Sequence, residues 1–174
     1  MGYQVSKGEI KPDPERLRPL KELPIPKSKK EQEKVVGLFA YYSQWIEKFS
    51  EKAYQLIHNT VFPLPLPAIQ SFHNLKRELE KAVLVTHDPT KPLVVETDAS
   101  DFAIAATLNQ NGRPVAFFSR TLNQSEKHHS PIEKEASAIV ESFRKWKHYL
   151  LGNQFTLLTD QEALSFMYNR HKTK

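Results

Sequence analysis

In the first half of the chain, apolar residues recur every three to four positions, which predicts helices. The clearest apolar face is formed by Val35, Leu38, Phe39, Tyr42, Trp45 and Ile46. Ser28 precedes it as a helix cap, and Glu31 three residues later completes a capping box. A shorter helix is expected over residues 51–58, and a third over residues 68–82. The inner face of the third helix is expected to carry Ile69, Phe72, Leu75 and Leu79.

Two proline-rich stretches divide this half of the chain. The first covers residues 12–26 and follows a short hairpin expected around Gly8. The second covers residues 62–67, where prolines alternate with other residues. Alternating prolines cannot continue a helix or lie in a central strand, so this stretch is interpreted as an extended connector.

From about residue 92 the period of the apolar pattern changes to two, which predicts strands. Strands are expected over residues 93–97, 102–108, 115–118 and 155–159. Asn111-Gly112 is a typical two-residue hairpin turn between the second and third strands. A long helix is expected over residues 131–150, closed by Gly152, and another helix over residues 162–168.

The order of these elements predicts the topology of the sheet. A helix that connects the third strand to the fourth makes the fourth strand parallel to a strand of the hairpin sheet, and the first strand is the expected partner. The fold class is therefore α/β (α+β), with a mixed sheet and a crossover helix, preceded by a mainly helical segment.

Composition narrows the possible functions. The formal charge of +5 and the pI near 9.3 fit a nucleic-acid binder, although a moderate excess of Lys also occurs on ordinary solvated surfaces. The chain has no Cys, which excludes disulfides, thiolate zinc sites and a Cys nucleophile. No apolar run approaches the roughly 20 residues of a membrane span, and no signal peptide is recognised, so an intracellular protein is expected.

Two of the expected strands end in the same pair of residues, Thr97-Asp98 and Thr159-Asp160. If these strands are parallel neighbours, both Asp side chains emerge at the carboxyl edge of the sheet, where open α/β sheets bind ligands. Two converging carboxylates repel each other unless a cation lies between them, and their hard oxygen atoms favour Mg²⁺ or Mn²⁺. A Thr-Asp pair also occurs as a turn or helix cap, so the spacing alone leaves a structural role open.

A third carboxylate is expected from the crossover helix, where Glu133 and Glu135 are the candidates. Both flank the apolar stripe, which is taken as Ile132, Ala136, Ile139, Val140 and Phe143, so periodicity does not choose between them. Ser130 is a good helix cap before Pro131, and a capping box would use Glu133 on the backbone. Glu135 is then left free for a metal.

Several motifs in this half resemble, in order, the ribonuclease H domain of Ty3/gypsy-type retrotransposons. They are residues 97–100 (TDAS), 118–122 (FSRTL), 133–136 (EKEA), 149–152 (YLLG) and 155–160 (FTLLTD). Upstream, residues 2–6 (GYQVS), 10–14 (IKPDP) and 37–42 (GLFAYY) resemble the reverse transcriptase thumb and connection of those elements. The resemblance divides the chain into a thumb-like segment (1–60), a connection helix and linker (61–90) and a ribonuclease H-like domain (91–174).

The resemblance implies that Asp98, Glu135 and Asp160 are catalytic acids that bind two Mg²⁺ or Mn²⁺ ions. It implies cleavage of the RNA strand of RNA–DNA hybrids, and the rest of a Pol polyprotein as partner, in the cytoplasm (virus-like particle) or nucleus. Arg120 is a candidate contact to nucleic acid, as are Arg144, Lys145 and Lys147. The alternative role of the last three is to complement the dipole at the end of the crossover helix.

Some features of the family are missing. Its fourth acidic residue follows a fifth strand and a further helix, which are expected beyond this chain, and the polymerase palm is absent as well. A catalytically inactive or co-opted fragment that binds nucleic acid without cleaving it is therefore the alternative hypothesis. A purely structural connection domain is disfavoured, because all three acids are present.

Overall fold

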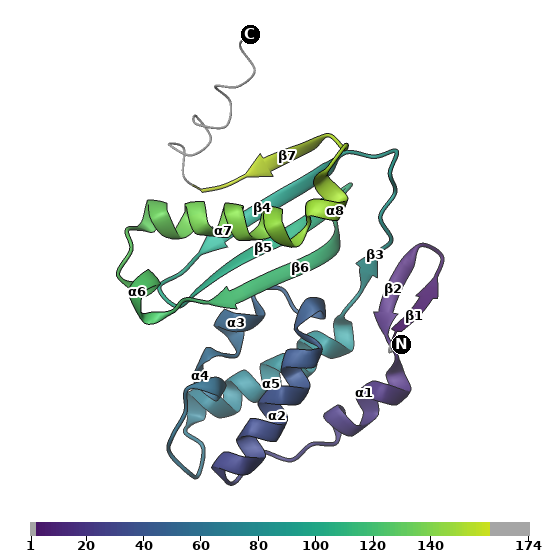
Figure 1. Cartoon of the computed structure of the whole chain (residues 1–174). Helices are drawn as coiled ribbons and strands as arrows, with labels where there is room; N and C mark the ends of the chain where they lie inside the picture. Colours follow the sequence, from purple (N-terminus) through teal and green to yellow (C-terminus); the bar gives the residue numbers. More distant parts are fainter. Residues whose placement is uncertain (1–2, 161–174) are drawn as a thin grey trace.

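The computed structural model describes residues 3–160 and contains two sheets (Figure 1). The smaller sheet is antiparallel and consists of β1 (Tyr3–Ser6), β2 (Glu9–Pro12) and β3 (Leu84–Val85), in that order. The expected hairpin around Gly8 is confirmed, since β1 pairs with β2 across this turn. β3 adds the segment just before the main sheet to this hairpin, and so ties the N-terminus to the middle of the chain.

The main sheet has the strand order β6-β5-β4-β7. β4 (Leu93–Ala99), β5 (Ala103–Gln110) and β6 (Arg113–Thr121) form an antiparallel meander, and β7 (Phe155–Leu158) runs parallel to β4. Asn111 and Gly112 join β5 to β6 with positive φ angles of 51° and 71°, as a tight hairpin turn requires. The mixed sheet with its parallel outer strand confirms the expected fold class.

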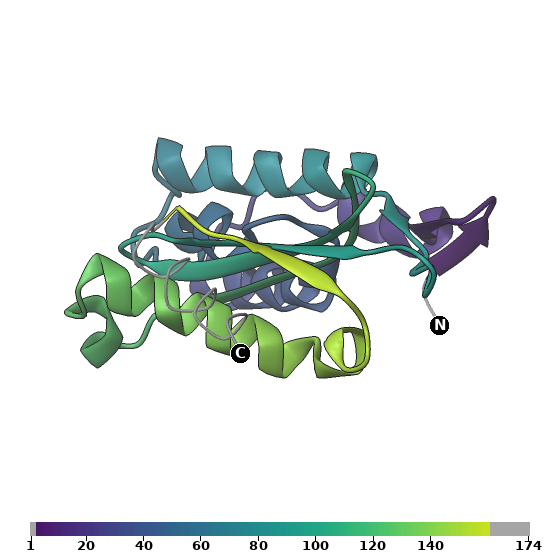
Figure 2. The same ribbon diagram turned by 90° about the horizontal axis from the view of Figure 1, so that it is seen from above.

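Helices pack against the main sheet from two sides (Figure 2). On one face lies α7 (Pro131–Lys145), which contacts β4 and β5 and is followed by α8 (Lys147–Leu150). The N-terminal half, with α5 (Leu66–Lys81) and several shorter helices, lies below the main sheet in Figure 1. Among these, the 3-10 helix η1 (Ser43–Trp45) and α3 (Phe49–Lys52) contact β6 directly.

Strand β6 contributes side chains to both of the two largest hydrophobic clusters. The first cluster lies within the helical half and includes Trp45, and the second lies between the sheet and α7–α8 and includes Trp146. Phe117 packs against the first cluster, whereas its neighbour Phe118 packs against the second. Because successive side chains of a strand point to opposite faces, one strand serves both clusters.

The first proline-rich stretch contains a helix that the sequence pattern did not predict. α1 (Pro14–Lys21) begins after Asp13, whose side chain accepts a hydrogen bond from the Glu15 N–H, and Pro14 occupies the first turn. Leu17 and Leu20 are buried in the first cluster. A proline in the first turn costs no hydrogen bond, so this stretch was wrongly interpreted as a joint alone.

The next helices are shorter than expected. α2 (Lys29–Tyr41) ends before η1, and Leu38, which was expected on its apolar face, is 42% exposed. In place of one helix over residues 51–58 there are two, α3 and α4 (Tyr54–Ile57), which begin after Lys48. Packing against β6 bends the chain here, and the apolar period does not report such bends. α5 agrees with its expected range to within two residues.

The crossover helix differs from expectation in its length and in its buried face. α7 ends at Lys145, and α8 follows it after Trp146. Ile132 and Val140 of the expected stripe are 46% and 41% exposed. The residues that α7 buries are Lys134, Glu135, Ala138, Ile139 and Ser142. The stripe was wrong at Ile132 and Val140, whereas Ile139 is buried and Phe143 packs against the second cluster. The sheet also accepts polar residues of the helix: the Ser142 hydroxyl donates a hydrogen bond to the Ile139 carbonyl.

A short helix, α6 (Gln124–Lys127), lies between β6 and α7 and was not predicted. The helix expected over residues 162–168 lies outside the described residues. None of the helices within residues 3–160 is long and apolar enough to cross a membrane.

Candidate active site at the carboxyl end of β4 and β7

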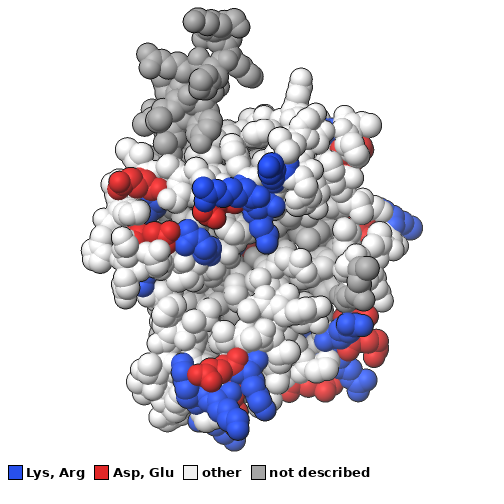
Figure 3. Space-filling view, in the orientation of Figure 1, with Lys and Arg blue, Asp and Glu red and all other residues white. Residues whose placement is uncertain are grey.

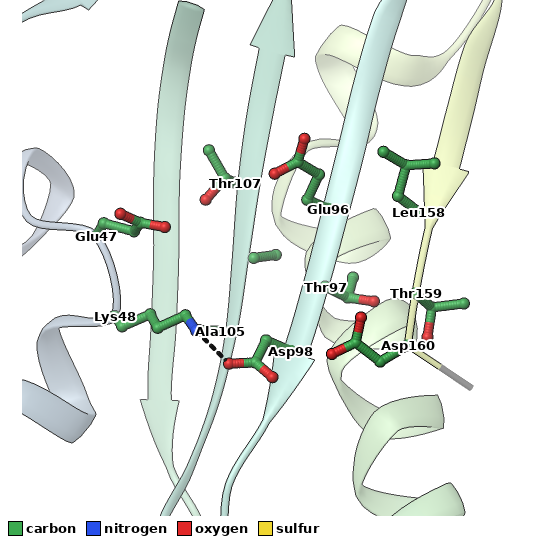
Figure 4. A pocket seen from close by; sticks show the side chains of 11 residues that line it. Glu47, Lys48, Glu96, Thr97, Asp98, Ala105, Thr107, Leu158, Thr159 and Asp160 are labelled. Carbon is green, nitrogen blue, oxygen red and sulfur yellow. Dashed lines mark ion pairs between the residues drawn. The ribbon is translucent and has the colours of Figure 1, made fainter. Parts of the chain in front are cut away.

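A polar pocket of about 390 Å³ opens beside the carboxyl ends of β4 and β7 (Figure 4). Its walls come from β4, from β5, from the end of β7 and from the loop between η1 and α3. Ala105 contributes only a methyl group to the floor, and Thr107 adds a hydroxyl. Small side chains in β5 thus leave room for a solute next to the acidic residues.

Asp98 and Asp160 both line this pocket. The parallel register pairs Leu93 with Phe155 and Glu96 with Leu158, and its continuation brings Asp98 abreast of Asp160. Figure 4 shows both carboxylates at the same edge of the sheet. The juxtaposition expected from the repeated Thr-Asp pair is therefore present.

Glu135 reaches the same edge from α7. Its Oε1 accepts a hydrogen bond of 2.9 Å from the Ala99 N–H, directly after Asp98 in the chain. The side chain is only 5% exposed, and its Oε2 has no hydrogen-bond partner among residues 3–160. Burial raises the pKa of the Glu135 carboxyl, and the negative charges of Asp98 and Asp160 raise it further.

Glu133, the other candidate, has a structural role. Its carboxylate accepts hydrogen bonds from the backbone N–H and the hydroxyl of Ser130, while the Ser130 hydroxyl accepts one from the Glu133 N–H. This reciprocal capping box confirms the prediction made for Ser130 and Glu133. These hydrogen bonds to Ser130 lower the pKa of the Glu133 carboxyl, in contrast to that of Glu135.

Sequence reasoning missed Lys48, which lies in the loop between η1 and α3. Its Nζ is 2.5 Å from Oδ2 of Asp98 (Figure 4). The hydrogen bond to Asp98 raises the pKa of the Lys48 ammonium, although partial burial opposes this. The contact joins residues fifty positions apart, so no local pattern could have revealed it.

The donor set fits a divalent cation in its chemistry. Carboxylate oxygens are the ligands that Mg²⁺ and Mn²⁺ prefer, and the unpartnered Oε2 of Glu135 is a buried acceptor that a cation would satisfy. In the described part of the chain, however, no three Asp, Glu, His or Cys side chains are already grouped closely enough to hold a metal ion. Asp98 instead holds the Lys48 ammonium.

The basic residues expected to contact nucleic acid lie elsewhere. Arg120 forms a two-point ion pair with Glu126 at 2.8 and 2.9 Å, and Arg144 pairs with Glu141. Lys145 and Lys147 are exposed near the end of α7. None of these four is among the described residues that line the pocket. On the face in Figure 3, Lys and Arg form separate groups next to Asp and Glu rather than one continuous basic surface.

A mixed sheet of this strand order, crossed by a helix and carrying acids at the carboxyl end of its parallel pair, defines a ribonuclease H-like domain. The family described as "RNase H-like domain found in reverse transcriptase" matches residues 88–174. The chain belongs to this family, and the resemblance inferred from its motifs is confirmed.

Similar proteins are retrotransposon polyproteins. The Retrovirus-related Pol polyprotein from transposon 297 of Drosophila melanogaster is 35% identical over 175 residues, which cover 97% of this chain and 16% of the relative. The Pol polyproteins from transposons opus and gypsy of the same species are 35% and 31% identical and cover 95% of this chain. The chain therefore spans less than a fifth of the length of these relatives, at 16%, 19% and 18%.

Among solved structures, the fold matches that of a foamy viral enzyme. The foamy viral protease-reverse transcriptase dRH in complex with double-stranded DNA superimposes with a TM-score of 0.77 at 20% identity, over 100% of this chain and 32% of that one. The protease-reverse transcriptase in complex with an RNA/DNA hybrid gives a TM-score of 0.69 at 18% identity, over 92% and 24%. At these identities the match establishes the fold.

Proposed function

We propose that this chain is the ribonuclease H module of a gypsy-type retrotransposon reverse transcriptase, and that it hydrolyses the RNA strand of RNA–DNA hybrids. One observation carries the proposal: Asp98 and Asp160 lie abreast beside a polar pocket, with the buried, unpartnered Oε2 of Glu135 at the same edge. Three carboxylates gathered at such an edge are costly for a fold unless they bind a cation.

Asp98, Glu135 and Asp160 are the residues that would hold Mg²⁺ or Mn²⁺, two ions in all. Bound there, the ions would activate water and stabilise the leaving oxygen of the phosphate ester. The Ala99 N–H fixes the position of Glu135 through Oε1 and leaves Oε2 for a ligand. Ala105 and Thr107 leave the pocket open for the substrate backbone.

The relatives support a nucleic-acid substrate and a polyprotein context. Their names describe Pol polyproteins of transposons, and one structural neighbour was solved with an RNA/DNA hybrid. By this analogy, the partners are an RNA–DNA hybrid and the remainder of a reverse transcriptase. The net charge of +5 is consistent with attraction to a polyanion.

A second candidate function is binding of nucleic acid without cleavage. The observation that favours it is the Lys48–Asp98 ion pair, which occupies an oxygen that a metal would need. In this case the three acids would be retained without activity, and the chain would bind the hybrid through its fold and its basic residues.

Hydrolysis of a labelled RNA–DNA hybrid in Mg²⁺ and in Mn²⁺ separates the two candidates. Asp98→Asn and Glu135→Gln are expected to lower the cleavage rate by at least about 100-fold, because each removes a ligand charge needed in the transition state. Glu22→Gln is the control: its side chain is 68% exposed and pairs with the equally exposed Arg18, so the rate should stay within about twofold. Hybrid binding without cleavage by the folded wild-type chain, in either metal, would favour the second candidate.

A further inference from the structure

The side chain of Lys48 occupies a position at the acidic edge that the proposed function does not explain. Its ammonium is 2.5 Å from Oδ2 of Asp98, and the two side chains are 40% and 35% exposed. It comes from the helical half of the chain, whereas Asp98, Glu135 and Asp160 all belong to the ribonuclease H-like half. The site therefore includes one cation that the chain itself supplies.

The backbone holds Lys48 in an unusual conformation. Its φ of 51° and ψ of 39° lie in the left-handed region, which costs a residue other than glycine about 1 kcal/mol. Ile46 and Phe49 on either side are buried at 1% and 7% exposure, so both ends of the loop are anchored in the first cluster. A change in the backbone of this loop would therefore disturb the packing of Ile46 or Phe49.

A direct contact between the halves fixes the loop against the sheet. The Ser50 N–H donates to the Ser119 hydroxyl of β6 at 3.0 Å, and the two hydroxyl oxygens are 3.1 Å apart. Ser50 is two residues after Lys48, so this contact fixes the backbone from which the Lys48 side chain extends. The strained backbone and this contact both direct Lys48 toward Asp98.

An ammonium and a divalent cation cannot use the same carboxylate oxygen. Two positive charges a few ångströms apart repel each other strongly, most of all where burial lowers the effective dielectric constant. Glu47 lines the same pocket as Lys48, and the charges of Glu47 and Glu51 both favour the ammonium (Figure 4). The long, partly exposed side chain of Lys48 can therefore leave Asp98 for these carboxylates without becoming an unpaired buried charge.

We propose that Lys48 competes with divalent cations for Asp98, so that the helical half regulates metal binding by the ribonuclease H-like half. This inference rests on the proposed function and adds a regulatory residue to that site. When the helical half holds Lys48 against Asp98, the acids bind metal weakly. When Lys48 moves to its neighbouring carboxylates, the acids are free to bind it. The coupling is reciprocal, because metal binding must in turn release Lys48.

The test is a titration of the full chain with Mn²⁺ in the absence of nucleic acid, with free Mn²⁺ measured by electron paramagnetic resonance. Lys48→Met removes the competing charge and is expected to tighten Mn²⁺ binding about 10-fold. Lys52→Met is the matched control, since it removes the same charge from a residue that pairs with Glu78. Its Mn²⁺ affinity should stay within about twofold of wild type. Equal or weaker binding by Lys48→Met, or no measurable binding by any variant, overturns the proposal.

Two more variants separate charge from packing. Lys48→Arg keeps a competing cation and is expected to bind Mn²⁺ like wild type. Lys48→Gly suits the left-handed backbone, and is expected to show the same gain as Lys48→Met even if the Met variant folds poorly. Asp98→Asn combined with Lys48→Met should lose the gain. A gain that persists in this double variant would place the binding elsewhere and overturn the proposal.

The outcome does not depend on hydrolysis. Tighter Mn²⁺ binding by Lys48→Met with no cleavage by any variant would sustain the competition and refute the proposed ribonuclease activity. Cleavage by wild type with unchanged affinity in Lys48→Met would sustain the activity and refute the competition.

Discussion

Neighbouring groups give the glutamates of this chain opposite properties. The carboxylate of Glu126 accepts hydrogen bonds from both terminal nitrogens of Arg120 and from the Asn123 N–H. The ion pair with Arg120, with the help of the Asn123 N–H, lowers the pKa of Glu126 to about 2. Glu135 shows the reverse, because burial raises its pKa. A carboxylate that serves the fold is thus stabilised in its charged form, and one at the candidate site is not.

Glu126→Gln should therefore destabilise the protein in a pH-dependent way. Because the pKa of Glu126 is lower in the folded state than the ordinary value of 4.5, its contribution is present above pH 4.5 and is lost as the pH falls toward 2. A loss of about 1 kcal/mol in the free energy of unfolding is expected at pH 7, and a much smaller one near pH 2. Urea unfolding at several pH values measures it.

Glu141→Gln is the control for this change, because the partner of Glu141 is Arg144, whose side chain is 73% exposed. Its effect should be close to zero at every pH. A loss in Glu126→Gln that does not change with pH would contradict the assignment.

At the scale of secondary-structure elements, most local signals in the sequence were dependable. The capping box expected for Ser28 and Glu31 is only half formed: the Ser28 hydroxyl accepts from the Glu31 N–H, but the Glu31 carboxylate accepts from the Lys27 N–H. The capping box of Ser130 and Glu133, the turn at Asn111-Gly112 and the positive φ of 79° at Gly152 all follow from a few adjacent residues. The ends of α2 and α7 and the buried face of α7 were wrong, because packing against the sheet determines them. Within the site, the meeting of Asp98 and Asp160 followed from their matched strand ends, whereas the contact of Lys48 depends on how the halves pack.

Ser130→Ala tests whether the cap stabilises the helix that carries Glu135. The substitution removes the hydroxyl that accepts from the Glu133 N–H, and a loss of about 1 kcal/mol is expected. For a chain of this size that lowers the Tm by about 2–4 °C in calorimetry. Ser137→Ala in the same helix is the control, because the Ser137 hydroxyl donates only to the Glu133 carbonyl within the helix. Equal Tm values for the two variants would show that the cap contributes nothing.

At the scale of the whole molecule, the shared strand β6 makes cooperative unfolding the expected behaviour. The two Trp residues of the chain report on different clusters, Trp45 on the first and Trp146 on the second. Single-Trp variants, Trp146→Phe and Trp45→Phe, allow urea unfolding to be followed by fluorescence in each half. Because Phe117 and Phe118 tie both clusters to β6, far-UV circular dichroism and fluorescence should give coincident transitions within each variant.

Transitions that separate would show instead that the halves unfold independently. Phe117→Ala offers a further check, since it weakens the packing of β6 on the helical half alone. If the halves are coupled, this variant should lower the midpoint recorded by Trp146 as well as that recorded by Trp45.

The packing of β6 against the helical half also limits which substitutions related chains can accept. Phe117 must fit a cluster built mostly from residues before 85, so a change of volume at either place calls for a matching change at the other. Substitutions at Phe117 and in the first cluster are therefore expected to be correlated among related chains. The matching family region begins at residue 88. Recombination between related retrotransposons near this residue would join a helical half to a sheet whose contact residues had not changed together. Such hybrids would need compensating substitutions where Phe117 of β6 packs against the first cluster.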